Sequence, residues 1–215
     1  MDHQTALRRP AVNAAFGKHL LFFPSRKIHG QVVCHSTLEA DYCIHLEYDP
    51  AVVRYCSQPG ELELRIDGQL HRYYPDFLVE TLEEHYYTEV KVDFSQVSTL
   101  WKAKLRAAQQ LLSETNSYLA RADLASIRPP ARLRNLKFLY FHSFNVNADE
   151  YGGCLRLLPT LSYPVTLREL LAHPAEVRER AIYKALFDRQ MRFDLNQRLT
   201  INTPILGGGH AHQQT

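Results

Sequence analysis

The chain has 215 residues, of which 45% are hydrophobic and 22% are charged, as in one medium globular domain or one domain with a small appendage. No apolar run approaches the roughly 20 residues that a membrane span requires, and the N-terminal MDHQTALRRP lacks the apolar core of a signal peptide. We therefore expect a cytoplasmic protein. The four cysteines form no CxxC pair, so neither a zinc site nor a disulfide framework is indicated.

The net charge is only +2, but the charges are segregated along the chain. Residues 39–94 hold 13 acidic and 4 basic residues, whereas residues 1–38 hold 5 basic and 1 acidic, and residues 95–142 hold 8 basic and 2 acidic. Basic flanks suit a polyanion such as DNA, and an acidic centre would repel that polyanion unless cations bind there. Ordinary solvated surface charge would produce the same pattern, so charge leaves both interpretations open.

The sequence gives only weak signals of secondary structure near its N-terminus. Residues 1–34 show no periodic element beyond the apolar patch LLFF, which the basic loop SRKIHG follows. The segment STLEADYCIHLEYDP at 36–50 predicts a helix that ends at its Asp-Pro pair, because Leu38, Tyr42 and Leu46 recur at helical spacing.

Strand signals dominate the next stretch. VVRYCSQP at 52–59 predicts a strand, and the alternating LELRIDGQLHRYY at 62–74 predicts a hairpin. Its turn falls at Asp67 and Gly68, residue types that accept the positive φ angles of a tight turn. FLV and YYTEVKV are then expected to form two further strands joined by ETLEEH, with Pro75 starting or interrupting the first.

Helices are expected to dominate the rest of the chain. SQVSTLWKAKLRAAQQLLSETN at 95–116 predicts an amphipathic helix. Its expected buried side carries Leu100, Leu105, Ala108 and Leu112. SYLARADLAS then fits a strand, and ARLRNLKFLYFHS fits either a helix or a strand. The stretch TLRE at 166–169 has the pattern of a capping box, two helices should follow with a boundary at the HP step, and MRFDLNQRLTINTPI should be extended.

Charged residues interrupt the apolar strand pair YYPDFLVETLEEHYYTEVKV at 73–92. Glu89 and Lys91 should share one face of their strand because side chains alternate between faces, and Val90 and Val92 on the other face are expected to pack against helices. Because Glu89 and Lys91 share a face, one function should account for both charges.

Asp76 supplies the third charge of this group. It opens the neighbouring strand, and the short connecting turn predicts antiparallel neighbours, so Asp76 can approach Glu89. Two adjacent carboxylates repel each other unless a cation lies between them, and hard oxygen ligands suit Mg²⁺ or Mn²⁺ rather than zinc. Lys91 beside them could orient an attacking water and stabilise the charge that develops on a phosphate during phosphodiester hydrolysis.

The spacing of Asp76, Glu89 and Lys91 resembles the PD-(D/E)xK nuclease motif of the restriction-endonuclease-like fold. A surface hairpin with a cross-strand Asp–Lys pair, worth less than about 1 kcal/mol, is the alternative. A further acid is expected from a preceding helix, and Glu39 is the candidate. Glu39 has a competing role in a helix capping box, in which its carboxylate would bond back to the amide of Ser36.

A longer pattern surrounds the motif. SRK, STLE and SQP precede YYPDFLV and TEVKV, and a lysine-containing helix follows. Over roughly residues 22–110 this combination resembles the TnsA family, the endonuclease subunit of heteromeric transposases. The resemblance implies an enzyme that cuts the 5′ strands at transposon ends. It also implies Mg²⁺ as cofactor, with Mn²⁺ able to substitute, and three partners: transposon-end DNA, a DDE-type transposase that cuts and joins the 3′ ends, and an AAA+ ATPase regulator.

The resemblance, the change of sequence character at EYGGCLRLLP near residues 150–160 and the polar, glycine-rich end GGGHAHQQT together predict a domain organisation. A PD-(D/E)xK endonuclease domain of mixed α/β class, with a central mixed β-sheet flanked by helices, would occupy residues 1–150. A small helical, winged-helix-like region would follow at residues 160–206, and residues 207–215 would form a disordered tail.

By this resemblance Glu39, Asp76 and Glu89 become metal ligands, the Val90 carbonyl is an extra ligand, and Lys91 is the catalytic base or the cation that orients water. Some relatives carry glutamine where this chain has Glu89, which is the residue of the general motif. Taken singly, each basic candidate for a DNA contact is better explained as an ordinary solvated side chain, and Gln58 is equally well explained as a strand-end side chain. The candidates are Arg26, Lys27, Gln58, Lys102, Lys104 and Arg106.

Two alternatives use the same fold. One is a nuclease of restriction or repair, which the SRK, STLE and SQP framework disfavours. The other is a non-catalytic DNA-binding adaptor, which the presence of all four motif residues disfavours.

Overall fold

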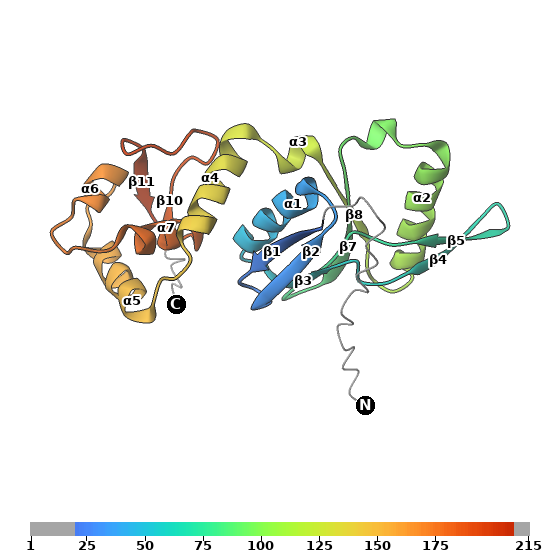
Figure 1. The fold of residues 1–215 in the computed structure, drawn as a ribbon, viewed down its shortest axis with the longest axis horizontal. Helices are drawn as coiled ribbons and strands as arrows, with labels where there is room; N and C mark the ends of the chain where they lie inside the picture. The colour runs from blue at the N-terminus through green and yellow to red at the C-terminus, as the bar shows by residue number, and fades with distance from the viewer. Residues whose placement is uncertain (1–19, 209–215) are drawn as a thin grey trace, which may run out of the picture. The chain divides into compact units, whose positions relative to one another are not determined.

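A computed structural model describes residues 20–208, which form two compact units with a boundary between Arg128 and Pro129 (Figure 1). The predicted boundary near residue 150 differs from this one because α4 (Pro130–His142) packs with α7 (Glu179–Phe187) in the second unit. The predicted tail begins at Gly207, which is still part of a strand, and residues 209–215 lie outside the described range.

The first unit is a mixed α/β fold around a four-stranded mixed sheet with the strand order β3-β6-β7-β8. The first three strands are antiparallel, and β8 runs parallel to β7. The predicted strands are therefore confirmed, including the antiparallel pair that carries the charged residues. Their bounds are β3 Val52–Ser57, β6 Phe77–Thr81, β7 His85–Lys91 and β8 Leu119–Asp123.

A helix covers each face of this sheet (Figure 1). On one side α1 (Thr37–Tyr48) lies against the β7 face of Thr88, whose hydroxyl is 3.2 Å from the Tyr42 hydroxyl. On the other side α2 (Thr99–Ser113) packs with β8 and the hairpin strands. The short helices η1 (Phe94–Gln96) and α3 (Leu124–Ile127) flank α2 and β8.

The buried side of α2 is partly as predicted. Leu105, Ala108 and Leu112 are buried in one cluster with Leu64, Tyr73 and Leu119. Leu100 is half exposed, so its predicted burial is wrong. The helix begins at Thr99 with Ser98 as its cap, and Trp101 packs against the cluster in place of Leu100.

The hairpin of β4 (Leu62–Ile66) and β5 (Gln69–Tyr73) confirms the predicted turn. Asp67 has φ 50° and Gly68 has φ 78°, the positive angles that this tight turn requires. Leu64 and Tyr73 point from this hairpin into the core under α2, while the opposite face is exposed.

A second hairpin, of β1 (Leu21–Ser25) and β2 (Gly30–Cys34), has no counterpart in the sequence prediction. Its turn is held by the buried carboxylate of Glu47 on α1. Glu47 accepts hydrogen bonds from the Ser25 hydroxyl, from the Tyr55 hydroxyl at 2.8 Å and from the Arg26 amide at 3.2 Å. These partners are distant in sequence, and for this reason periodicity did not reveal the hairpin.

The second unit combines helices with a small three-stranded antiparallel sheet of order β10-β11-β9. The segment ARLRNLKFLYFHS, for which the sequence left helix and strand open, is a helix. The predicted capping box is also present, because the Thr166 backbone amide donates to the Glu169 carboxylate at 2.6 Å. The remaining bounds are α5 Ala148–Leu157, η2 Leu158–Thr160, β9 Val165–Thr166, α6 Leu167–Leu171, β10 Met191–Arg192 and β11 Pro204–Gly207.

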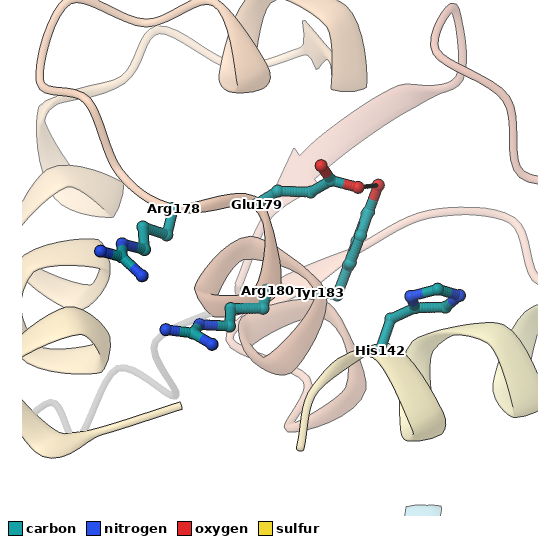
Figure 2. A pocket seen from close by; sticks show the side chains of 5 residues that line it. All are labelled: His142, Arg178, Glu179, Arg180 and Tyr183. Carbon is teal, nitrogen blue, oxygen red and sulfur yellow. Dashed lines mark hydrogen bonds between the residues drawn. The ribbon is translucent and has the colours of Figure 1, made fainter. Parts of the chain in front are cut away.

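This unit has a pocket of about 370 Å³, lined by His142, Arg178, Glu179, Arg180 and Tyr183 (Figure 2). The Tyr183 hydroxyl donates to Glu179 across the pocket. Both guanidinium groups pair with Glu150, Arg178 at 3.1 Å and Arg180 at 2.7 Å. Glu150 and Glu179 supply two carboxylates against the two guanidinium groups, so the formal charges of these four side chains balance.

Candidate functional site

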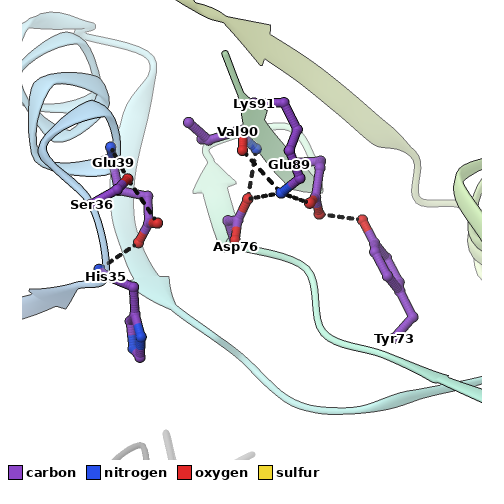
Figure 3. A network of polar contacts seen from close by, with 8 residues as sticks. All are labelled: His35, Ser36, Glu39, Tyr73, Asp76, Glu89, Val90 and Lys91. Atoms are coloured by element: carbon purple, nitrogen blue, oxygen red, sulfur yellow. Dashed lines mark hydrogen bonds and ion pairs between the residues drawn. The ribbon is translucent and has the colours of Figure 1, made fainter. Parts of the chain in front are cut away.

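The ends of β6 and β7 bring Asp76, Glu89 and Lys91 together (Figure 3). Asp76 immediately precedes β6, and the antiparallel register that pairs Phe77 with Thr88 places it next to the end of β7. The Val90 amide fixes this geometry by donating to Asp76 Oδ2 at 2.7 Å. The carboxylates and the ammonium are thus held together by strand pairing.

Lys91 is the cation that joins the two acids. Its Nζ forms an ion pair with Glu89 Oε1 and lies 3.6 Å from Asp76 Oδ2. The same Nζ donates to the Val90 carbonyl at 3.1 Å. Val92, expected to pack against a helix, is instead exposed, because β7 ends at Lys91 and the alternation of faces ends with it.

Burial makes this cluster electrostatically costly. Glu89 is only 1% exposed, and burial together with the nearby Asp76 charge raises the pKa of Glu89 to about 7. Burial also raises the pKa of Asp76, with Lys91 opposing that rise. Burial acts to lower the pKa of Lys91, but the Asp76 and Glu89 carboxylates outweigh it and the pKa is raised. Lys91 is therefore charged at neutral pH, and the two acids favour a cation between them.

Glu39 lies across from this cluster at the start of α1 (Figure 3). Its carboxylate accepts from the His35 amide at 2.8 Å and from the Ser36 hydroxyl at 3.0 Å. The predicted bond to the Ser36 amide is therefore wrong, because the carboxylate reaches the amide one residue earlier. Burial, and to a lesser extent the Asp76 charge, raises the pKa of Glu39. The carboxylates of Glu39 and Asp76 thus repel each other electrostatically. No hydrogen bond or ion pair between described residues joins Glu39 to the cluster.

If the cluster cleaves DNA, as the motif resemblance implies, we expect Glu39→Gln to slow that cleavage about tenfold or more while leaving the fold intact. A glutamine oxygen can still accept the His35 amide, so the helix start is preserved, whereas the negative charge that would attract a metal is removed. Cleavage rates and thermal denaturation of both proteins check this.

The matched control for this variant is Ser36→Ala. It removes the helix cap, at a cost of about 1 kcal/mol, and keeps the Glu39 charge. A Glu39→Gln protein that cleaves as fast as the unmodified chain would assign Glu39 to the helix start alone.

The oxygen atoms of the cluster form a donor set that fits Mg²⁺. Asp76, Glu89 and the Val90 carbonyl are hard ligands, and Mg²⁺ commonly binds one or two carboxylates while keeping several waters. Within residues 20–208 no three His, Cys, Asp or Glu side chains converge closely enough to hold a metal ion. Lys91 instead contacts both acids, so binding a metal ion there requires its ammonium to withdraw.

Several residues beside the cluster were not identified as site residues from the sequence. The buried Tyr73 hydroxyl donates to Glu89 Oε2 at 2.5 Å, and the Lys91 Nζ lies 5.2 Å from the centre of the Trp101 ring. Arg121 on β8 is directly opposite Glu89 in the parallel register. Only the strand register, the position of the hairpin and the packing of α2 bring these residues to the site, and no local pattern in the sequence indicates them.

The candidate DNA contacts divide into two groups. The backbone of Gln58 lies at the site, since its backbone N–H donates to the Asp76 carbonyl at 2.8 Å, and its φ of 46° is unusual for a residue other than glycine. Lys104 also lies nearby, 5.6 Å from the Trp101 ring centre, and donates to the Arg72 carbonyl at 2.9 Å. Lys27 belongs to the second group, because its Nζ donates to the carbonyls of Asp49 and Val52 and not to the cluster.

For the three remaining candidates, the interactions described within residues 20–208 do not involve the cluster. The Arg26 amide donates to Glu47, the Lys102 Nζ donates to the Ser95 carbonyl at 3.2 Å, and Arg106 is exposed on α2. Lys102 and Arg106 therefore remain candidates for backbone phosphates at a distance from the reacting bond.

A scan of protein-family models finds no match for this chain, and no curated protein sequence is significantly similar to it. Among the described residues, no helix is both long enough and apolar enough to span a membrane. A functional assignment therefore rests on the motif and on the geometry of the site.

Proposed function

We propose that this protein is a Mg²⁺-dependent DNA endonuclease with a restriction-endonuclease-like core. In this proposal it is a TnsA-like subunit of a heteromeric transposase and cleaves the 5′ strands at transposon ends. The observation that carries the proposal is the meeting of Asp76, Glu89 and Lys91 at the ends of two paired strands, with the motif spacing that the sequence predicts. The mixed sheet with a helix on each face supports the core.

The chemistry of the cluster suits phosphodiester hydrolysis. A bound Mg²⁺ would supply positive charge to the scissile phosphate and to the attacking water. Asp76, Glu89 and the Val90 carbonyl would hold that ion. Hydrolysis transfers a proton from the water to the leaving deoxyribose oxygen, so the site must orient the water and offset the charge on the phosphate.

Lys91 would act as a cation and not as a base. When no metal ion is bound, the two neighbouring carboxylates raise its pKa, so Lys91 carries its proton at neutral pH. A phosphate oxygen or the attacking water would then replace a carboxylate as the acceptor for the ammonium. Of the two roles that the family resemblance implies, the electrostatics favour the cation that orients water.

Basic side chains beside the cluster would hold the DNA backbone. Lys104 on α2 and Arg121 on β8 flank Glu89 on the same face of the sheet. The Arg121 guanidinium lies 5.6 Å from the centre of the Phe94 ring, which orients it. Contacts of this kind position DNA without reading its sequence, so sequence recognition would come from the DDE-type transposase, and regulation from an AAA+ ATPase.

The test is a reconstituted transposition reaction. The chain is combined with the DDE-type transposase and AAA+ ATPase expected to be encoded beside its gene, and with DNA that carries the element's ends. We expect 5′-strand cleavage with Mg²⁺ or Mn²⁺ and none with a chelator. Cleavage that persists in chelator would refute the metal dependence, and cleavage of unrelated DNA without the transposase would favour a restriction or repair nuclease.

A further inference from the structure

We propose that Tyr73 and Trp101 are positioning residues that hold the Glu89 carboxylate and the Lys91 ammonium in place for metal and phosphate binding. The inference rests on the proposed nuclease function and deepens it. Neither residue belongs to the nuclease motif. Tyr73 comes from the β4–β5 hairpin and Trp101 from the first turn of α2, so two elements outside the β6–β7 pair would shape the site.

Tyr73 anchors one carboxylate oxygen of Glu89 through a hydrogen bond from its hydroxyl. Its side chain is 1% exposed, and its hydroxyl donates to Glu89 Oε2 at 2.5 Å. The other oxygen, Oε1, pairs with Lys91 (Figure 3). Because one oxygen is anchored from the hairpin, the second is directed toward Lys91 and Asp76 and cannot rotate away freely. Such anchoring of a ligand typically changes metal affinity about 10- to 100-fold.

Trp101 supports both groups from the helix side. Its ring centre is 5.9 Å from that of Tyr73 at an interplanar angle of 67°, an edge-to-face contact. The Lys91 Nζ lies 5.2 Å from the same ring centre, within range of a cation–π attraction. One indole therefore contacts the tyrosine that anchors Glu89 and the lysine that pairs with it.

The contacts described for the Trp101 side chain are made by its ring. Its Nε1 is buried and has no hydrogen-bond partner among the described residues. A buried donor without an acceptor is unfavourable and uncommon. The edge-to-face contact with Tyr73 and the cation–π contact with Lys91 are favourable interactions that the same ring makes at the site.

Tyr55 provides a matched control within the same unit. It is 2% exposed, and its hydroxyl donates to the buried Glu47 carboxylate at 2.8 Å. Tyr55→Phe and Tyr73→Phe thus each remove one buried hydroxyl–carboxylate hydrogen bond. Only Tyr73 bonds to a residue of the cluster, so a general loss of stability should affect both variants and a positioning role only one.

The experiment measures Mn²⁺ binding to the full chain without DNA. Free Mn²⁺ is followed by electron paramagnetic resonance, and a parallel titration follows the emission of Trp101, the single tryptophan of the chain. We expect Tyr73→Phe to raise the half-saturating Mn²⁺ concentration about 10- to 100-fold, and Tyr55→Phe to leave it unchanged. Trp101→Leu removes the ring that packs on Tyr73, so by loosening the anchor of Glu89 it should weaken Mn²⁺ binding in the same direction, as measured by paramagnetic resonance alone. Asp76→Asn should abolish the response, which identifies the signal with this site.

The outcomes separate the two proposals. Equal Mn²⁺ affinity in Tyr73→Phe and the unmodified chain, or an equal loss in Tyr55→Phe, overturns the positioning role and leaves the nuclease proposal standing. No saturable binding by the unmodified chain also overturns the positioning role as stated. In that case the reconstituted cleavage reaction with chelator decides separately whether the nuclease proposal fails.

Discussion

Asp76→Asn and Lys91→Met are each expected to reduce cleavage of the 5′ strands about 10²- to 10³-fold in the reconstituted reaction. Asparagine still offers an oxygen to the Val90 amide, 2.7 Å from Asp76 in the structure, so the strand ends stay paired while the ligand charge is lost. Methionine keeps most of the length of Lys91 and removes the ammonium that pairs with both acids. Cleavage at the two strands is measured separately on end-labelled DNA.

The two strands should respond differently, and this difference makes the prediction specific. In the proposed division of labour the DDE-type partner cuts the 3′ strands, so both variants should keep 3′ cleavage and accumulate cointegrates in place of simple insertions. Glu80→Gln is the matched control, because Glu80 lies on β6 and pairs with the exposed Arg54 at 2.6 Å. Undiminished 5′ cleavage in both site variants would overturn the assignment of the active site.

Glu47→Ala is expected to lower the free energy of unfolding of the first unit by about 3 kcal/mol. The substitution removes the acceptor for the Ser25 hydroxyl, the Tyr55 hydroxyl and the Arg26 amide at once. It also removes a negative charge near the partly buried Lys27 ammonium. The β1–β2 hairpin would lose its attachment to α1. Urea unfolding followed by Trp101 emission measures the effect, because that residue lies in the same unit.

Glu83→Ala is the control for this stability prediction. Glu83 is exposed in the turn between β6 and β7, and its replacement should change the free energy of unfolding by less than about 0.5 kcal/mol. Unfolding midpoints that coincide for Glu47→Ala and Glu83→Ala would show that the buried carboxylate is not needed to hold the hairpin.

Short-range physics explains which elements were predictable. The hairpin turn at Asp67 and Gly68 follows from the φ angles that these residues accept, and the capping box at Thr166 follows from side chains three residues apart. The shared face of Glu89 and Lys91 follows from strand alternation. In each case the interacting groups lie within a few residues, so their spacing in the sequence determines their geometry.

Errors arose where a residue's environment depends on distant partners. Leu100 continues the apolar pattern of α2, yet it is exposed because the helix packs through Trp101 instead. The unit boundary lies at residue 128 because Arg128 pairs with Asp41 on α1 at 2.6 Å, while α4 packs with α7. These contacts join segments dozens of residues apart, and composition near residue 150 carries no information about them.

The candidate site likewise has a part that local sequence patterns predicted and a part that depends on long-range contacts. Sequence alone supplied Asp76, Glu89 and Lys91, since a short turn and strand alternation suffice to place three charges at the ends of neighbouring strands. Tertiary structure decided their surroundings. It placed the Tyr73 hydroxyl on Glu89, the Trp101 ring beside Lys91 and Arg121 opposite Glu89, through hairpin docking, helix packing and a parallel strand pair. It also gave Glu39 hydrogen bonds to its own helix start. Such long-range contacts depend on how whole elements pack, and no local pattern encodes them.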